Sequence, residues 1–141
     1  MAAPAKITAC YDFLSIRNLL DRVFDRTFGR VFDQLIDNTD RNLGNLVIDN
    51  QWRLWMIDHT RAFRSTTKIR SEANLVMCER RLLANMRKLD EDTLNEKLRP
   101  FLTKTEIKSM LTRRDKVVQF FDDAVTQKGQ GAVLYDLPQR E

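Results

Sequence analysis

Three polar residues near the middle of the sequence have the types and the spacing of a phosphoryl-transfer site. Asp40 and Asn45 flank four residues, and Asp58 follows Asn45 later in the chain. Phosphoryl transfer needs a carboxylate that orients the attacking hydroxyl, and oxygen ligands that hold Mg²⁺ on the phosphates. The spacing D-x-x-x-x-N presents such a base and such a ligand from a single turn. We therefore take Asp40 as the candidate catalytic residue, and Asn45 and Asp58 as candidate metal and cofactor ligands.

The same residue types also have a simpler interpretation. Asp and Asn side chains often bond to nearby backbone groups and stabilise turns. On this view Asp40, Asn42 and Asn45 form a turn, and Asp58 caps the end of a strand. The two interpretations differ in whether these side chains converge on one point in the fold.

The elements around these residues predict that they do converge. Apolar residues recur at helical spacing over 11–38, with Gly29 as a weak point, and a polar loop follows. Two short runs rich in β-branched and aromatic residues, 46–48 and 53–57, are separated by four polar or aromatic residues. This pattern predicts a β-hairpin, which would fold Asp58 back towards Asn45.

The rest of the sequence predicts more helices. Helical spacing returns over 71–89, and Thr103 with Glu106 matches a capping box that begins another helix. An apolar pattern over 113–127 ends at Lys128-Gly129, a basic last turn followed by a glycine. We expect a single domain over 1–141, mainly α with a short β-hairpin, and a loose tail over about 129–141.

Composition argues against several other classes of protein. The 24 Lys and Arg are interleaved with 20 Asp and Glu, a pattern of solvated helix faces that does not favour nucleic-acid binding. No apolar span approaches 20 residues, which argues against membrane insertion and secretion. Cys10 and Cys78 lack metal-ligand spacing and have one histidine, His59, to assist them. Two reduced thiols favour a cytoplasmic protein.

The loop and the hairpin together resemble a known family. The stretch from Asp40 to Asp49, DRNLGNLVID, followed by Trp55-Met56-Ile57-Asp58-His59, resembles the catalytic and metal-binding loops of phosphatidylinositol 3- and 4-kinases. The preceding stretch from Phe32 is similar to the corresponding part of HipA-type bacterial serine kinases. The resemblance covers about 31–63, with the two loops at about 38–63.

The resemblance implies a kinase C-lobe that uses ATP and Mg²⁺. It assigns Asp40 as the catalytic aspartate, Asn45 as one Mg²⁺ contact and Asp58 as the DFG-type metal aspartate. Asn42 stands where lipid kinases usually have His, and Asp58-His59-Thr60 replaces D-F-G. No glycine-rich loop or strand lysine precedes residue 31, so we expect activity only if an N-lobe is supplied.

A second function is also consistent with the sequence. A helical domain derived from a kinase could act as a non-catalytic protein-interaction module. Without an N-lobe the cleft surface would be uncovered, and Trp52, Trp55 and Met56 are candidates for exposure. A homodimer through this surface is the simplest expected assembly. We assign Asp33 and Asp37, just upstream, to the helix, and we expect their replacement to have only small effects.

Overall fold

The computed structural model describes residues 26–50 and 54–137. The first described helix is α3 (Arg26–Ile36), and Gly29 lies within it without ending it. The earlier part of the expected helix, as well as Cys10 and Trp52, lies outside the described residues. The other helices and 3-10 turns are η1 (Leu43–Asn45), η2 (Glu72–Asn74), α4 (Arg80–Arg87), α5 (Glu91–Leu98), α6 (Lys104–Lys128) and α7 (Gln130–Val133).

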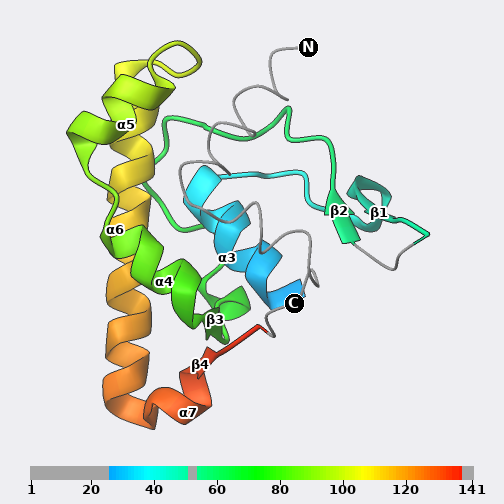
Figure 1. Cartoon of the computed structure of the whole chain (residues 1–141), viewed down its shortest axis with the longest axis vertical. Helices are drawn as coiled ribbons and strands as arrows, with labels where there is room; N and C mark the ends of the chain where they lie inside the picture. The colour runs from blue at the N-terminus through cyan, green and yellow to red at the C-terminus, as the bar shows by residue number, and fades with distance from the viewer. Residues whose placement is uncertain (1–25, 51–53, 138–141) are drawn as a thin grey trace.

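The other described α-helices pack against the long helix α6 (Figure 1). Thr103 and Glu106 form the predicted capping box at its start, and Gly129 follows its end with a φ of 82°. Helices α3, α4, α5 and α7 all contact it. None of the described helices is long and apolar enough to cross a membrane.

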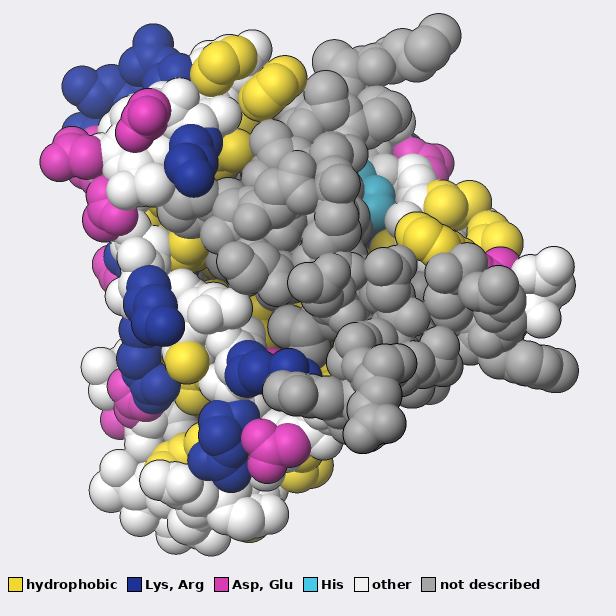
Figure 2. All heavy atoms as spheres, in the orientation of Figure 1, with side chains coloured by type: hydrophobic (Ala, Val, Ile, Leu, Met, Phe, Trp, Pro, Cys, Tyr) yellow, Lys and Arg dark blue, Asp and Glu magenta, His cyan; other side chains and the backbone are white. Residues whose placement is uncertain are grey.

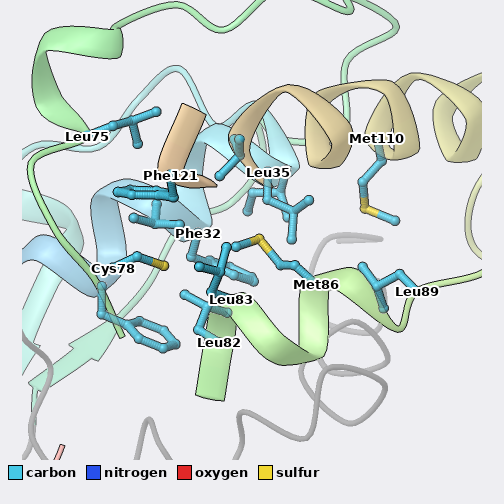
Figure 3. Packing of buried hydrophobic residues seen from close by; sticks show 14 of the residues in the cluster. Phe32, Leu35, Leu75, Cys78, Leu82, Leu83, Met86, Leu89, Met110 and Phe121 are labelled. Carbon is cyan, nitrogen blue, oxygen red and sulfur yellow. The ribbon is translucent and has the colours of Figure 1, made fainter. Parts of the chain in front are cut away.

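The hydrophobic core fills the space between α3, α4 and α6. Phe32 and Leu35 from α3 lie close to Met86 of α4 and to Met110 and Phe121 of α6 (Figure 3). On α6 the buried positions recur every three or four residues, as a helix with one inward face requires. The positions with this spacing are Ile107, Met110, Arg113, Val117 and Phe121, and Ser109 beside Met110 is buried as well.

The predicted hairpin is present, so the expectation of a mainly α fold with a short β-hairpin is confirmed. Strands β1 (Leu46–Ile48) and β2 (Leu54–Met56) pair antiparallel, with Val47 opposite Trp55. The hairpin lies on the opposite side of α3 from α6 (Figure 1).

Three segments differ from the sequence-based expectations. The helix expected over 71–89 begins only at Arg80, and α5 was not predicted. The segment expected to be a loose tail forms α7 and strand β4 (Leu134–Tyr135), which pairs parallel with β3 (Cys78–Glu79). Val133 and Leu137 bury their side chains there. A parallel pair between strands so far apart in sequence leaves no local pattern, which explains why it was missed.

Arg113 joins α6 to the segments that carry the candidate site. Its guanidinium is fully buried and donates to the carbonyl oxygens of Leu35, Arg64 and Thr66. Burial lowers the pKa of Arg113, and the nearby charge of Asp37 acts in the opposite direction. Arg113 therefore links both the end of α3 and the segment after the hairpin to α6, and Ser109 and Lys116 add bonds to the carbonyl oxygens of Ser65 and Thr67 in that segment.

Candidate functional site

The loop that carries Asp40 begins with a sharp turn at the end of α3. Asp37 adopts the left-handed conformation, with a φ of 52°, and ends the helix. The Asn38 amide then donates to the carbonyl oxygen of Asp33, at 2.9 Å, and its side chain donates to the Asp33 carboxylate, at 3.1 Å. These bonds fix the direction in which the chain leaves the helix.

Within the loop, Asn45 is bonded to the backbone of Asp40. The Asn45 side-chain Nδ2 donates to the Asp40 carbonyl oxygen at 2.6 Å. Because the amide nitrogen makes this bond, the amide oxygen Oδ1 points elsewhere and accepts no hydrogen bond from the described residues. The amide oxygen is the atom that a Mg²⁺ ion would require.

The Asp40 carboxylate is partly exposed and only weakly paired. Its side chain is 38% exposed, and its one ion pair within the described ranges is a 3.9 Å contact with Arg61. An exposed pair at that distance contributes little to stability. The carboxylate can therefore accept a hydrogen bond from an incoming hydroxyl group.

The hairpin brings Asp58 beside Asn45. The Ile57 amide donates to the Asn45 carbonyl oxygen at 3.0 Å, immediately beyond the pairing of Leu46 with Met56. Asp58 is the next residue after Ile57, so its backbone lies one position beyond the residue opposite Asn45, although thirteen positions separate Asn45 and Asp58 in sequence. This is the approach that the hairpin pattern predicted.

Asp58 is an exposed carboxylate in a tight turn. It has a φ of 52°, and its Oδ1 accepts hydrogen bonds from the Thr60 hydroxyl, at 2.7 Å, and the Thr60 amide, at 3.3 Å. These bonds lower the pKa of Asp58, with the hydroxyl bond as the largest cause. The group is therefore ionised at neutral pH. The same bonds are those of a turn-forming aspartate, so both of the roles considered from the sequence remain consistent with it.

The Arg41 guanidinium holds the two loops together. Its Nε and Nη2 bind the Asp33 carboxylate at 2.9 and 3.0 Å. Its Nη1 donates to the carbonyl oxygens of Asn45, at 3.1 Å, and Ile57, at 3.2 Å. Its Nη2 also lies 3.0 Å from His59 Nε2. Since an arginine has five N–H donors, these contacts use all of them.

The two titratable partners of Arg41, Asp33 and His59, are buried, and their pKa values are shifted accordingly. Burial lowers the pKa of His59 to about 4, and the charge of Arg41 acts in the same direction. The ring is therefore neutral at pH 7, and with its proton on Nδ1 its Nε2 accepts a hydrogen bond from Arg41 Nη2. Burial raises the pKa of the Asp33 carboxyl, although the hydrogen bonds and charge of Arg41 oppose the rise.

The structure corrects the expectation for the two upstream aspartates. Asp33 is buried and bound to Arg41, and Asp37 is buried and bound to Arg70 Nε at 2.6 Å. Neither residue lies on the surface of a helix. Replacing either one should therefore have more than a small effect. Asp37 also lies just beyond α3 rather than inside it. Paired burial of both carboxylates means that each helps to fix the loop that follows α3.

The candidate ligand set is small. Asn45 and Asp58 supply the oxygen atoms, and the described ranges contain no cluster of three or more His, Cys, Asp or Glu that could hold a metal ion. Two protein ligands suit Mg²⁺, which keeps several waters and binds chiefly through substrate phosphates. They do not suit a closed structural metal site.

Exposed apolar side chains surround the hairpin. Hydrophobic residues gather there beside the single histidine (Figure 2). We define the hairpin patch as Leu43, Val47, Trp55 and Ile57, which are 41–85% exposed. Met56, which we had expected to be exposed, is partly buried against the core instead.

Comparison with known proteins does not assign the chain to a family. No family model matches the sequence, and no curated protein is significantly similar to it. The geometry of the two loops is therefore the basis for the function considered next.

Proposed function

We propose that this chain is the catalytic half of an ATP- and Mg²⁺-dependent phosphotransferase of the kinase type. Asp40 would orient the acceptor hydroxyl, and Asn45 and Asp58 would hold the metal on the phosphates. The observation that carries the proposal is the hydrogen bond from the Ile57 amide to the Asn45 carbonyl oxygen, at 3.0 Å. It brings the backbone next to Asp58 against that of Asn45, so the two segments that carry the proposed oxygen ligands are neighbours, and both are close in sequence to the partly exposed Asp40 carboxylate.

The chemistry of these donors fits a magnesium–nucleotide complex. When bound, Mg²⁺ neutralises charge on the transferred phosphoryl group. Asn45 Oδ1 and the ionised Asp58 carboxylate would provide two of its oxygen ligands. Asp40 would accept a hydrogen bond from the acceptor and fix the angle of its attack. Residues that hold the adenine would come from an N-lobe, which the proposal treats as a separate segment or chain.

The proposal places the protein in the cytoplasm, where ATP and Mg²⁺ are available. The thiol of Cys78 is consistent with that location. It is buried, and burial raises its pKa to about 12, so it is protonated and unreactive. It needs no disulfide partner to be stable.

The first test uses the metal alone. Titration of the full chain with Mn²⁺ should broaden NMR signals near Asn45 and Asp58 first, because these residues provide the adjacent oxygen ligands. Asp58→Ala should weaken this binding by at least about fivefold, since a carboxylate is the stronger of the two ligands. Asp92→Ala is the control, because Asp92 is an exposed carboxylate at the start of α5. Broadening that persists at the same sites in Asp58→Ala would rule out the assigned metal site.

A second candidate function is a protein-interaction module, as considered from the sequence. The hairpin patch supports it, because Val47 and Trp55 face each other across the strands and are 43% and 41% exposed. Adjacent exposed apolar residues favour association. This function and phosphoryl transfer are compatible if the patch receives the N-lobe.

If the patch mediates a homodimer, sedimentation at high micromolar concentration should show dimers, and Trp55→Ser should shift the population to monomers. A buried interface aromatic commonly contributes 2 kcal/mol or more, roughly a thirtyfold change in the dissociation constant. Phe101→Ser is the matched control, because Phe101 is 38% exposed and lies away from the hairpin. A monomeric wild type at that concentration would contradict the homodimer.

A further inference from the structure

A polar pocket lies beside the candidate catalytic loop and is not used by the proposed phosphoryl transfer. It has a volume of about 540 Å³ and lies between α3, the 38–43 loop and the 70–74 segment. The candidate residues Asp40, Asn45 and Asp58 are not among its described lining residues. The pocket is therefore a distinct feature of the fold that needs its own explanation.

The charges in the pocket favour an anion. Its described lining includes the cations Arg30, Arg41 and Arg70, but only one acidic residue, Asp33. The Asp33 carboxylate is bound by two nitrogens of Arg41, so its charge is already balanced. Arg70 is likewise paired with the buried Asp37, so the charge of Arg30 is the one that makes the pocket positive overall.

The three arginines differ in what they can offer to a ligand. Arg41 has no spare donor, because its five N–H groups have partners. Arg70 binds Asp37 through Nε and Nη2, which leaves Nη1 with no bond to the described residues. The Arg30 side chain makes no hydrogen bond or ion pair with the residues that the structure describes. Arg30 and Arg70 are therefore the residues able to bind an anion directly.

The other lining residues add neutral polar groups. Gln34 and Asn74 both carry side-chain amides, and Asn74 Nδ2 already donates one of its two N–H groups to Ser71 Oγ at 2.8 Å, which leaves it one further donor. Gln34 uses its Oε1 to accept from the Arg70 amide at 3.0 Å, so its Nε2 donor is directed away from that bond. An arginine fork combined with amide donors is a typical arrangement for binding phosphate or carboxylate groups.

We propose that this pocket binds a small molecule that carries a phosphate or carboxylate group, with Arg30 and Arg70 as its main contacts. Binding requires neither ATP nor a metal ion. Anion binding in this pocket can therefore be tested separately from the phosphotransferase function, and failure of one would not disprove the other.

The test is an NMR titration of the full chain with inorganic phosphate at constant ionic strength, without ATP or Mg²⁺. Backbone and side-chain amide signals of Gly29, Gln34, Asn38 and Asn74 should shift together and saturate, because all four residues line the pocket. Citrate, which has carboxylates only, is titrated in parallel. A stronger response to phosphate indicates a phosphorylated ligand, and a stronger response to citrate indicates a carboxylated one.

Variants distinguish a specific pocket from general attraction to a basic protein. Arg30→Gln should weaken binding at least about tenfold, since it removes a charge-assisted contact. Thr39→Glu, which adds a carboxylate at an exposed lining position, should weaken it without touching the arginines. Arg99→Gln, which makes the same charge change at an exposed position away from the pocket, should have no effect. Equal affinity in Arg30→Gln and Arg99→Gln, or shifts spread over the whole basic surface, would overturn the proposal.

Discussion

Replacing Asp40 by Asn should reduce the rate of phosphoryl transfer about a thousandfold when the chain works with an ATP-binding lobe. A positioned general base contributes roughly 10²- to 10⁴-fold, and the amide of Asn cannot accept the hydroxyl proton. The effect should fall on kcat, because Asp40 contacts the acceptor and not the nucleotide. The KM for ATP should therefore change less than about twofold.

Steady-state kinetics of a fusion that joins a kinase N-lobe to Met1 measure this effect. Joining the lobe further along, inside α3, would interrupt a helix whose residues are in the core. Asp49→Asn is the control, because it makes the same chemical change on the hairpin, where Asp49 Oδ2 accepts from Trp55 Nε1 at 2.8 Å. An equal loss of rate in both variants would mean that Asp40 has no special role.

Replacing Arg41 by Met should lower the free energy of unfolding by about 3 kcal/mol at pH 7. Breaking a buried ion pair by removing one partner typically costs 3–5 kcal/mol, because the remaining charge loses its compensation. Here the Asp33 carboxylate, with a side chain only 6% exposed, would keep only its bond from Asn38. The carbonyl oxygens of Asn45 and Ile57 would lose a donor as well.

The loss of stability in Arg41→Met should become larger as the pH rises. Without Arg41, the rise in the pKa of Asp33 on burial would be opposed only by the Asn38 hydrogen bond, so the folded variant would bind a proton that the unfolded chain releases above about pH 4. The stability of the variant should therefore fall, relative to wild type, as pH rises from 4 to 7. Urea unfolding at both pH values measures the difference.

Two further variants test whether the loss of stability is specific to Arg41 or would follow from replacing any arginine. Arg41→Lys keeps the charge but lacks the five-donor fork, so it should fall between wild type and Arg41→Met. Arg61→Met removes an exposed arginine near the same loop and should change stability by less than about 0.5 kcal/mol. Hydrogen exchange of the Ile57 amide should accelerate only in the Arg41 variants, because its partner loop is no longer held. Unchanged stability in Arg41→Met would show that the Arg41 side chain does not stabilise the fold.

The elements that could be predicted from the sequence are those with a local pattern. The hairpin follows from two β-branched runs on either side of a turn, and the start of α6 follows from the Thr103 and Glu106 side chains. The approach of Asp58 to Asn45 follows from the hairpin. Each of these features depends on residues close together in the chain, so residue types and their spacing are sufficient to predict it.

Features that depend on distant partners could not be predicted in this way. Arg41 lies among turn-forming residues and resembles any solvated arginine, but its partners come from α3, the loop and the segment after β2. The signal that could have indicated its role is the pair of acidic residues upstream, Asp33 and Asp37, within an otherwise apolar helical pattern. The pairing of β3 with β4 was missed for the same reason, because its residues lie at opposite ends of the helical region.

The most direct test of the central claim is Mg²⁺-dependent transfer of the γ-phosphate by the N-lobe fusion, measured beside its affinity for nucleotide. Wild type should transfer phosphate only with Mg²⁺. Asp58→Asn should lose both transfer and the Mg²⁺ dependence of nucleotide binding, whereas Asp40→Asn should lose transfer alone. A folded fusion that binds Mg²⁺-ATP and transfers phosphate equally well with Asp40→Asn or Asp58→Asn would contradict the account.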